Sequence, residues 1–100
     1  MPIITLLTDF GTADGYVAEM KGVLLTELPS ATVIDIAHDV PAHDLDAGRL
    51  AIARYWRRFP RGTVHLAVVD PGVGSARAAI PDESEGRFLV LYINLFTPRD

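Results

Sequence analysis

The sequence predicts an α/β domain built on a parallel sheet, with helices packed on it and a hairpin at its end. Three short runs rich in aliphatic and β-branched residues, at positions 3–8, 32–36 and 63–69, are separated by two segments whose apolar residues recur every three or four positions. The first pattern is typical of buried strands and the second of amphipathic helices. Strands that alternate with helices through short links require parallel pairing and right-handed crossovers.

The first strand is expected at residues 3–8 and the first helix at 15–28. Pro29 ends this helix, because proline lacks a backbone N–H and clashes with the preceding turn. Thr12 or Asp14 is expected to cap the first turn. The apolar stripe of the helix is expected to comprise Tyr16, Met20, Val23, Leu24 and Leu28.

The second strand, at 32–36, runs into a loop at 37–43, and Asp44 is expected to cap the helix that follows. The Pro-Arg-Gly sequence at 60–62 stops that helix before the third strand at 63–69. The apolar stripe of the second helix is expected to comprise Leu45, Gly48, Ile52, Tyr55, Trp56 and Phe59.

After Arg77 the alternation of strands and helices changes. Residues 78–80 and 87–93 resemble strands, and the polar segment 81–86 between them is typical of a turn. We therefore expect the order of elements to end in a β-hairpin. No internal repeat or low-complexity segment interrupts this order.

The composition limits the classes of function. The chain has 100 residues, a net charge of −4 and no cysteine, which excludes disulfides and thiolate metal sites. Arg57, Arg58 and Arg61 form the only local basic cluster, and a solvated helix end explains it better than nucleic-acid binding. The first residues lack a signal-peptide pattern, and no run approaches the roughly 20 apolar residues of a membrane span. We expect a soluble cytoplasmic protein that binds neither membrane nor nucleic acid.

Polar residues follow each strand of the predicted parallel sheet. The carboxyl ends of parallel strands share one edge, and open α/β sheets bind ligands there. We therefore expect these polar side chains to line one crevice. They are Asp9, Asp14, His38, Asp39, His43, Asp44, Asp70 and Arg77.

Asp9 and Asp14 flank the turn from the first strand into the first helix. Either could cap the helix. Asp9 comes before the turn and is better placed to accept hydrogen bonds from a ligand. Its two carboxylate oxygens suit a pair of sugar hydroxyls.

Asp70 and Arg77 are the strongest candidate pair. A Pro-Gly turn follows Asp70, and Gly72 and Gly74 allow the backbone to approach a ligand closely. A salt bridge that pins the loop is one interpretation of the pair. In the other, the arginine keeps the carboxylate ionised and the two side chains orient a water molecule.

The remaining polar residues allow a structural and a catalytic interpretation. Asp35, inside the second strand, is expected to be a buried structural carboxylate, and His38 a loop histidine with satisfied hydrogen bonds. A metal-dependent hydrolase would use Asp9, Asp14, His38 and Asp70 as ligands. Metal sites usually show tighter local spacing than these residues have.

Five motifs in order resemble one family, the S-adenosylmethionine hydroxide adenosyltransferases, which are related to the fluorinases and chlorinases. The resemblance runs from residue 3 to about residue 80. The motifs are Thr8-Asp9-Phe10-Gly11 with Asp14, Met20-Lys21-Gly22-Val23, Asp35-Ile36-Ala37-His38, Phe59-Pro60 with Gly62-Thr63-Val64-His65, and Val69-Asp70-Pro71-Gly72-Val73-Gly74-Ser75 with Arg77.

The resemblance implies a reaction in which water or hydroxide attacks the ribose C5′ of S-adenosylmethionine, giving adenosine and L-methionine. It implies that Asp9 binds the ribose hydroxyls with Asp14 nearby, and that Asp70 and Arg77 are two of three water-activating residues. The third, a histidine, lies beyond residue 100 in the family. The other substrate-binding residues implied are Phe10, His43 and Gly72.

The resemblance also implies an architecture. Residues 1–100 are expected to form a single N-terminal domain of a two-domain protein, without the family's β-rich C-terminal domain. Family members are trimers that hold S-adenosylmethionine between subunits and need no cofactor or metal. The chain alone is therefore expected to turn over weakly or not at all. Two alternatives are a non-catalytic nucleoside-binding module and the metal-dependent hydrolase.

Overall fold

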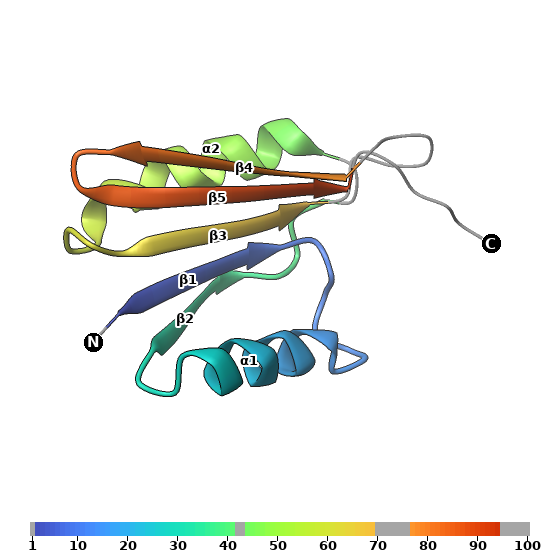
Figure 1. The fold of residues 1–100 in the computed structure, drawn as a ribbon. Coiled ribbons are helices and arrows are strands. Elements are labelled where there is room, and N and C mark those ends of the chain that lie inside the picture. The colour runs from blue at the N-terminus through green and yellow to red at the C-terminus, as the bar shows by residue number, and fades with distance from the viewer. Residues whose placement is uncertain (1, 42–43, 70–76, 95–100) are drawn as a thin grey trace.

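The computed structural model describes residues 2–41, 44–69 and 77–94. These residues form a five-stranded sheet in the order β2-β1-β3-β5-β4. The strands are β1 (Ile3–Thr8), β2 (Thr32–Ala37), β3 (Val64–Val69), β4 (Arg77–Ser84) and β5 (Arg87–Asn94), and the helices are α1 (Tyr16–Glu27), α2 (Leu45–Tyr55) and the short 3₁₀ helix η1 (Trp56–Arg58). All pairs are parallel except β4 with β5, as Figure 1 shows. The predicted fold class is confirmed.

The main core lies between α2 and one face of the sheet. Its buried members are Leu7, Val40, Ile52, Ala67 and Val69. Gly48 allows α2 to approach the sheet, because a Cβ atom at this position would lie 3.4 Å from Val69 Cγ2. The predicted cap is confirmed, since Asp44 Oδ1 accepts a hydrogen bond of 2.9 Å from the Ala47 N–H.

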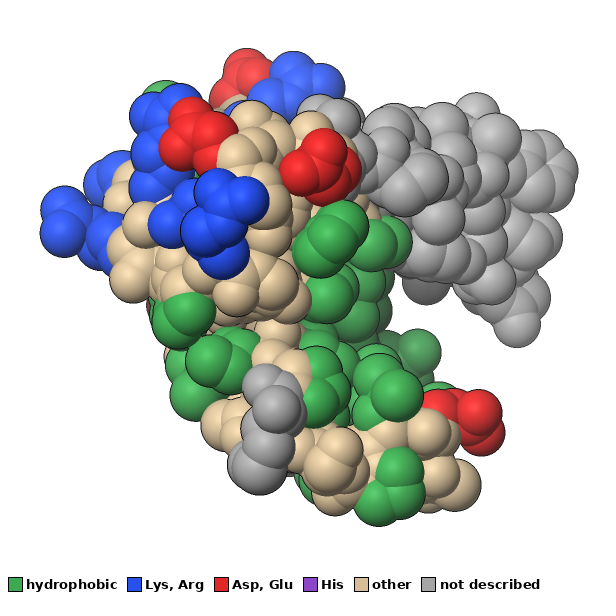
Figure 2. All heavy atoms as spheres, turned by 60° about the vertical axis from the view of Figure 1, so that its left-hand side comes forward, with side chains coloured by type: hydrophobic (Ala, Val, Ile, Leu, Met, Phe, Trp, Pro, Cys, Tyr) green, Lys and Arg blue, Asp and Glu red, His purple; other side chains and the backbone are tan. Residues whose placement is uncertain are grey.

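Most of the predicted apolar stripe of α1 lines one groove, but little of it is buried. Only Val17 is buried in this helix, whereas Tyr16, Val23 and Leu28 are exposed. Most of the stripe borders an open groove beside Leu66, where Figure 2 shows apolar side chains around a hollow above α1. The period of the apolar residues identifies one face of the helix. It does not tell how much of that face the described part of the sheet covers.

The N-terminus of α1 also differs from the expectation. Its N-cap is Gly15, with a φ of 77°, and no side chain caps it there. Asp14 stands one residue earlier and accepts a hydrogen bond of 3.1 Å from the Tyr16 N–H. Asp14 thus serves the first turn from outside the cap position.

The predicted hairpin exists, but its turn is shorter than expected. Pro81 lies within β4, which is tolerated because β4 is an edge strand. The turn consists of Glu85 and Gly86, whose φ values are 51° and 75°. Two successive residues with positive φ are typical of a type I′ hairpin turn. Glutamate is uncommon in that conformation, so the sequence did not indicate it.

His65 joins β3 to β1 and to η1 inside the core. The Thr5 hydroxyl lies 2.8 Å from its Nδ1 and the Trp56 carbonyl oxygen 3.0 Å from its Nε2. His65 is 1% exposed. A neutral imidazole satisfies both contacts, because Nδ1 accepts from the hydroxyl while the N–H at Nε2 donates to the carbonyl.

No helix in the described part of the chain is long and apolar enough to cross a membrane. The basic cluster Arg57, Arg58 and Arg61 lies at the end of α2, as expected. Its members bond to the β4–β5 turn and to the helix itself, on Glu85 side-chain and backbone oxygens and on the Arg54 carbonyl. The cluster therefore fastens this corner of the fold.

Replacing His65 with glutamine should lower stability and remove a pH dependence. Burial lowers the pKa of His65 below its usual 6.5, so the unfolded chain takes up a proton at a higher pH than the folded chain. The free energy of unfolding of the parent should therefore be fully maintained above pH 6.5 and fall as the pH drops below this value. The variant should lose about 1–3 kcal/mol, because the Thr5 hydroxyl loses its acceptor.

Urea unfolding at about pH 8 and about pH 5.5 measures both effects. The stability difference between parent and variant should shrink at the lower pH. A difference that stays constant would contradict the assignment of a neutral, buried imidazole.

Candidate active site

The carboxyl ends of the parallel strands bring several predicted site residues to one edge of the sheet. Thr8 pairs with Val68, and Asp9 follows Thr8 directly. Val69 and Ala78 both pair with Ile93, from opposite sides of β5. The backbone of Arg77, the first residue of β4, therefore lies at the same end of the sheet as Asp9. Figure 1 shows β1 ending and β4 beginning at this end, with β3 and β5 between them.

Three hydrogen bonds donated by backbone N–H groups hold the loop that follows β1. The Phe10 N–H donates to Thr8 Oγ1 at 3.2 Å, and the Gly11 N–H donates to the His38 carbonyl at 2.6 Å. The Val40 N–H donates to the Thr8 carbonyl at 3.2 Å, which ties the loop after β2 to the end of β1. Gly11 has a φ of 71°, a conformation that costs glycine little. The half-buried Asp9 lies within this fixed segment.

His38 is buried and connects the two loops through its side chain. Its Nδ1 lies 2.8 Å from Thr8 Oγ1, and its Nε2 lies 2.7 Å from Asp35 Oδ1. The expectation of a satisfied histidine is confirmed. Both ring nitrogens of His38 thus have a protein partner.

Asp35 differs from the sequence expectation, because its side chain is 43% exposed rather than buried. It belongs to β2, which is an edge strand of the described sheet. Its Oδ2 accepts a hydrogen bond of 2.5 Å from Lys21 Nζ in α1. This bond, together with the one from His38, lowers the pKa of Asp35 below its usual value.

Asp14 and Phe10 stay close to the loop. Asp14 is exposed beside the start of α1, and its carboxylate holds the Tyr16 N–H. The Phe10 ring meets the Tyr16 ring edge to face, with centroids 4.7 Å apart. This contact joins the loop after β1 to the first turn of α1.

Other predicted site residues fall elsewhere. His43, Asp70 and Gly72 lie outside the described residues, and only the backbone of Arg77 is placed. Asp39 is exposed and lines a groove between α2 and β2. Within the described ranges, no group of three or more histidine or acidic side chains is arranged to hold a metal ion.

Sequence reasoning did not assign a role to Thr8 or Lys21, although both occur in its motifs. A role for Thr8 could have been inferred from its position, because it places a hydroxyl at the last residue of a buried strand. A buried hydroxyl needs a partner, and the histidine after the neighbouring strand was available. Nothing in the spacing indicated that Lys21 reaches Asp35.

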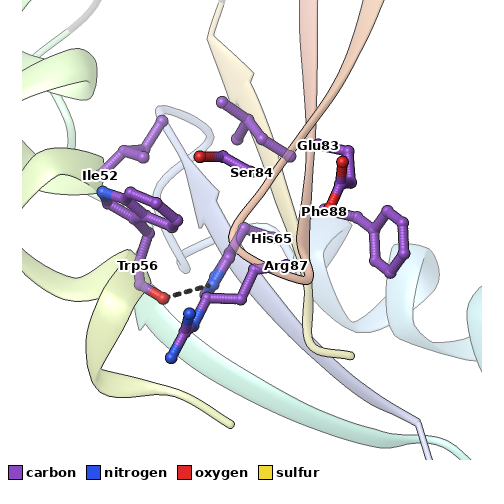
Figure 3. Close-up of a pocket in the computed structure, with 8 residues that line it drawn as sticks. Ile52, Trp56, His65, Glu83, Ser84, Arg87 and Phe88 are labelled. Carbon is purple, nitrogen blue, oxygen red and sulfur yellow. Dashed lines mark hydrogen bonds between the residues drawn. The ribbon is translucent and has the colours of Figure 1, made fainter. Parts of the chain in front are cut away.

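A cavity of about 260 Å³ lies at the opposite edge of the sheet, between η1 and the β4–β5 hairpin (Figure 3). Trp56, His65 and Arg87 line it. The Arg87 guanidinium donates to the Phe59, Glu85 and Arg57 carbonyls at 2.8, 3.0 and 3.3 Å. The Arg87 guanidinium and the His65 ring in this cavity are already hydrogen-bonded to protein atoms. We therefore do not take the cavity as the candidate active site.

Comparison with known proteins gives the family. Residues 4–94 match the family model described as the SAM hydroxide adenosyltransferase N-terminal domain. The chain is 49% identical over 79 residues to an (R)-S-adenosyl-L-methionine hydrolase of Salinispora arenicola, covering 79% of this chain and 30% of the relative. It is 42% identical over 95 residues to the hydrolase of the same name in Methanocaldococcus jannaschii, covering 90% of this chain and 36% of the relative.

A fluorinase of an Actinoplanes species is 35% identical over 79 residues, covering 79% of this chain and 26% of the relative. The chain thus spans about 30% of the length of the curated hydrolases that it matches. The fold also matches solved structures.

A conserved hypothetical protein from Thermus thermophilus has a TM-score of 0.78 and 41% identity, covering 92% of this chain and 38% of that one. An uncharacterized conserved protein from Thermotoga maritima has a TM-score of 0.80 and 37% identity, covering 89% of this chain and 35% of that one. Sequence and fold agree along nearly the whole described chain, and the chain therefore belongs to the family of SAM hydroxide adenosyltransferase N-terminal domains.

Proposed function

We propose that this chain is the N-terminal, substrate-binding part of a hydrolase that converts S-adenosyl-L-methionine to adenosine and L-methionine. The observation that carries the proposal is that Asp9 and the Arg77 backbone lie at the same end of the sheet, the end where β3 stops, with β3 and β5 between them. In the sequence, Asp70 directly follows Val69, the last residue of β3. The names of the relatives support the substrate.

Asp9 is proposed to bind the ribose. A carboxylate offers two acceptor oxygens, which match the two adjacent hydroxyls of a ribose ring. The backbone contacts on both sides of Asp9 limit its freedom, so that less entropy is lost when the ligand binds. Phe10, Asp14, His43 and Gly72 are proposed to complete this part of the substrate pocket.

Asp70 and Arg77 are proposed to prepare the water. An oxygen–carbon bond forms at C5′ while the carbon–sulfur bond breaks, and its electron pair returns to sulfur as the neutral thioether of methionine. The water loses a proton to solvent through the carboxylate. The arginine keeps the carboxylate ionised, and the two side chains hold the water in line with the leaving sulfur.

A second domain and neighbouring subunits are proposed to supply the rest of the pocket, as the resemblance implies. The chain alone is then expected to bind nucleoside more readily than it turns over substrate. The metal-dependent alternative would require His38 to exchange its contact with the Thr8 hydroxyl for a metal ion. The same nucleoside site without turnover remains an outcome of the experiments below.

The reaction can be tested by product analysis. The chain is incubated with each sulfonium diastereomer of S-adenosyl-L-methionine, because the prefix R in the relatives' name refers to the sulfonium centre. We expect slow adenosine release, or none, from the chain alone. Adenosine should appear faster from the R form in a full-length form that carries this domain, in the presence of a chelator. Complete loss of activity with the chelator would contradict the proposed mechanism.

Asp9→Asn should weaken adenosine binding about 10- to 100-fold, because hydrogen bonds to a charged acceptor contribute about 1.5–3 kcal/mol. Titration calorimetry measures the dissociation constant. Asp46→Asn is the matched control, since it removes the same charge from an 87% exposed side chain of α2. Equal affinities of the two variants would argue against ribose binding by Asp9.

Asp70→Asn and Arg77→Ala should each reduce turnover by about two to four orders of magnitude in a full-length form, the range expected for loss of a positioned acid–base group. The KM for substrate should change much less, because neither side chain is proposed to bind the ribose. Circular dichroism and thermal unfolding serve as folding controls. Turnover at the parent rate in either variant would rule out its role in water activation.

A further inference from the structure

We propose that His38 is a positioning residue for the nucleoside site. Through the Thr8 hydroxyl it fixes the loop that carries Asp9, so that this carboxylate is presented to the ribose hydroxyls. The inference rests on the proposed function, because it takes Asp9 as the ribose ligand. It adds a residue that never touches the substrate but sets the geometry of one that does.

One pattern of hydrogen bonds satisfies every atom in the contact. The Phe10 N–H donates to Thr8 Oγ1, which leaves the Thr8 O–H free to donate to His38 Nδ1. The ring then carries its proton on Nε2, which faces the Asp35 carboxylate at 2.7 Å. The opposite neutral tautomer would place a lone pair of Nε2 against that carboxylate. Between the two neutral tautomers, the contacts therefore select the one with the proton on Nε2, and with it one direction for the Thr8 hydroxyl.

A register irregularity brings His38 to Thr8. From Ile3 to Leu6, β1 pairs with β2 in regular register, ending with Leu6 opposite Asp35. The next pair joins Leu7 to Ala37, so that Ile36 is skipped. Without this irregularity, Ala37 would stand opposite Thr8 and His38 one position further along.

The same irregularity puts Asp35 and His38 on one side of the strand. Residues three apart in a regular strand point to opposite faces. One extra residue restores a common face, which is why Asp35 can hold the ring of His38. Such irregularities often re-aim a side chain beside an active site.

His38 also holds the loop through its backbone. Its carbonyl oxygen accepts from the Gly11 N–H, so the side chain and main chain of one residue restrain Thr8, Phe10 and Gly11. Asp9 lies between these restrained positions in the sequence. The ion pair of Lys21 and Asp35 is partly exposed and contributes little by itself. Its use is to hold the carboxylate against His38.

The chain contains a matched control for this contact. Thr5 and His65 form the same pair, with 2.8 Å between Oγ1 and Nδ1, and both side chains are buried. Thr5 lies inside β1, three residues before Thr8, and the other ring nitrogen of His65 bonds to the Trp56 carbonyl. This pair therefore stabilises the core without restraining the loop after β1.

The test compares Thr8→Val with Thr5→Val in the whole chain. Both variants keep the side-chain shape and lose one buried hydroxyl bonded to a histidine, so both should lower the melting temperature. Adenosine affinity, corrected for the folded fraction, should fall about tenfold in Thr8→Val and less than about twofold in Thr5→Val. With 2′,3′-dideoxyadenosine, which lacks the ribose hydroxyls, the two variants should bind alike. Equal losses of adenosine affinity in both variants would overturn the proposal.

Two replacements of His38 separate its contacts. Asparagine can place an acceptor near the position of Nδ1, whereas glutamine can place a donor near the position of Nε2. If the Thr8 contact positions the loop, His38→Asn should retain more adenosine affinity than His38→Gln. The opposite order would overturn the proposal. In the parent, ¹⁵N NMR should find the His38 proton on Nε2, and a proton on Nδ1 alone would also overturn it.

Amide hydrogen exchange separates this proposal from the proposed function. The Phe10 and Gly11 amides should exchange at least about tenfold faster in Thr8→Val than in Thr5→Val, with or without ligand. If the parent binds neither adenosine nor S-adenosylmethionine, the proposed function fails and the positioning role fails with it, even where exchange confirms that His38 orders the loop. Adenosine binding by the parent with equal exchange in the two variants would overturn the positioning role alone.

Discussion

The parallel pairing of β1 with both of its neighbours is the constraint on which the rest of the structure depends. β1 bonds to β2 on one side and to β3 on the other, and Leu6, Leu7 and Thr8 are fully buried. A shift of one residue would turn its two apolar faces around and break both ladders. The chain must therefore leave the sheet at Asp9, at the edge where β3 ends and β4 begins. The position of the candidate site follows from this register.

Most element types could be predicted from the sequence, because each buried strand is a short run of aliphatic and β-branched residues and the α2 stripe has a clear helical period. The Asp44 cap and the parallel order followed from local chemistry. The contact between Asp35 and His38 could not be predicted, since the rule of alternation places residues three apart on opposite faces. The exposure of α1 was equally hidden, because a sequence period gives the apolar face of a helix but not what covers it. The chemistry of Asp70 and Arg77 stays a prediction.

The two threonine–histidine pairs show how location decides the use of one interaction. Both join a β1 hydroxyl to a ring nitrogen at 2.8 Å in a buried place. At Thr5 the neighbours on both sides are strand residues, so the bond adds stability alone. At Thr8 the next residues leave the sheet, and the same oxygen also accepts from the Phe10 N–H. Burying a polar group costs free energy. Of the two pairs, only the one at Thr8 also defines the geometry of a loop.

Charge separates the two edges of the sheet. Arginines gather near the amino end of β3, where Arg57, Arg61 and Arg87 bond to the β4–β5 turn (Figure 2). The carboxyl edge carries mainly aspartates, with Asp9 and Asp14 after β1 and others after β2, besides Arg77 at the start of β4. The substrate of the proposed function is a sulfonium cation, which such an arrangement attracts to the carboxylate edge and repels from the opposite one. Arg57, Arg61 and Arg87 therefore fasten the hairpin at the edge away from the proposed site, and Arg77 is the arginine proposed to act within it.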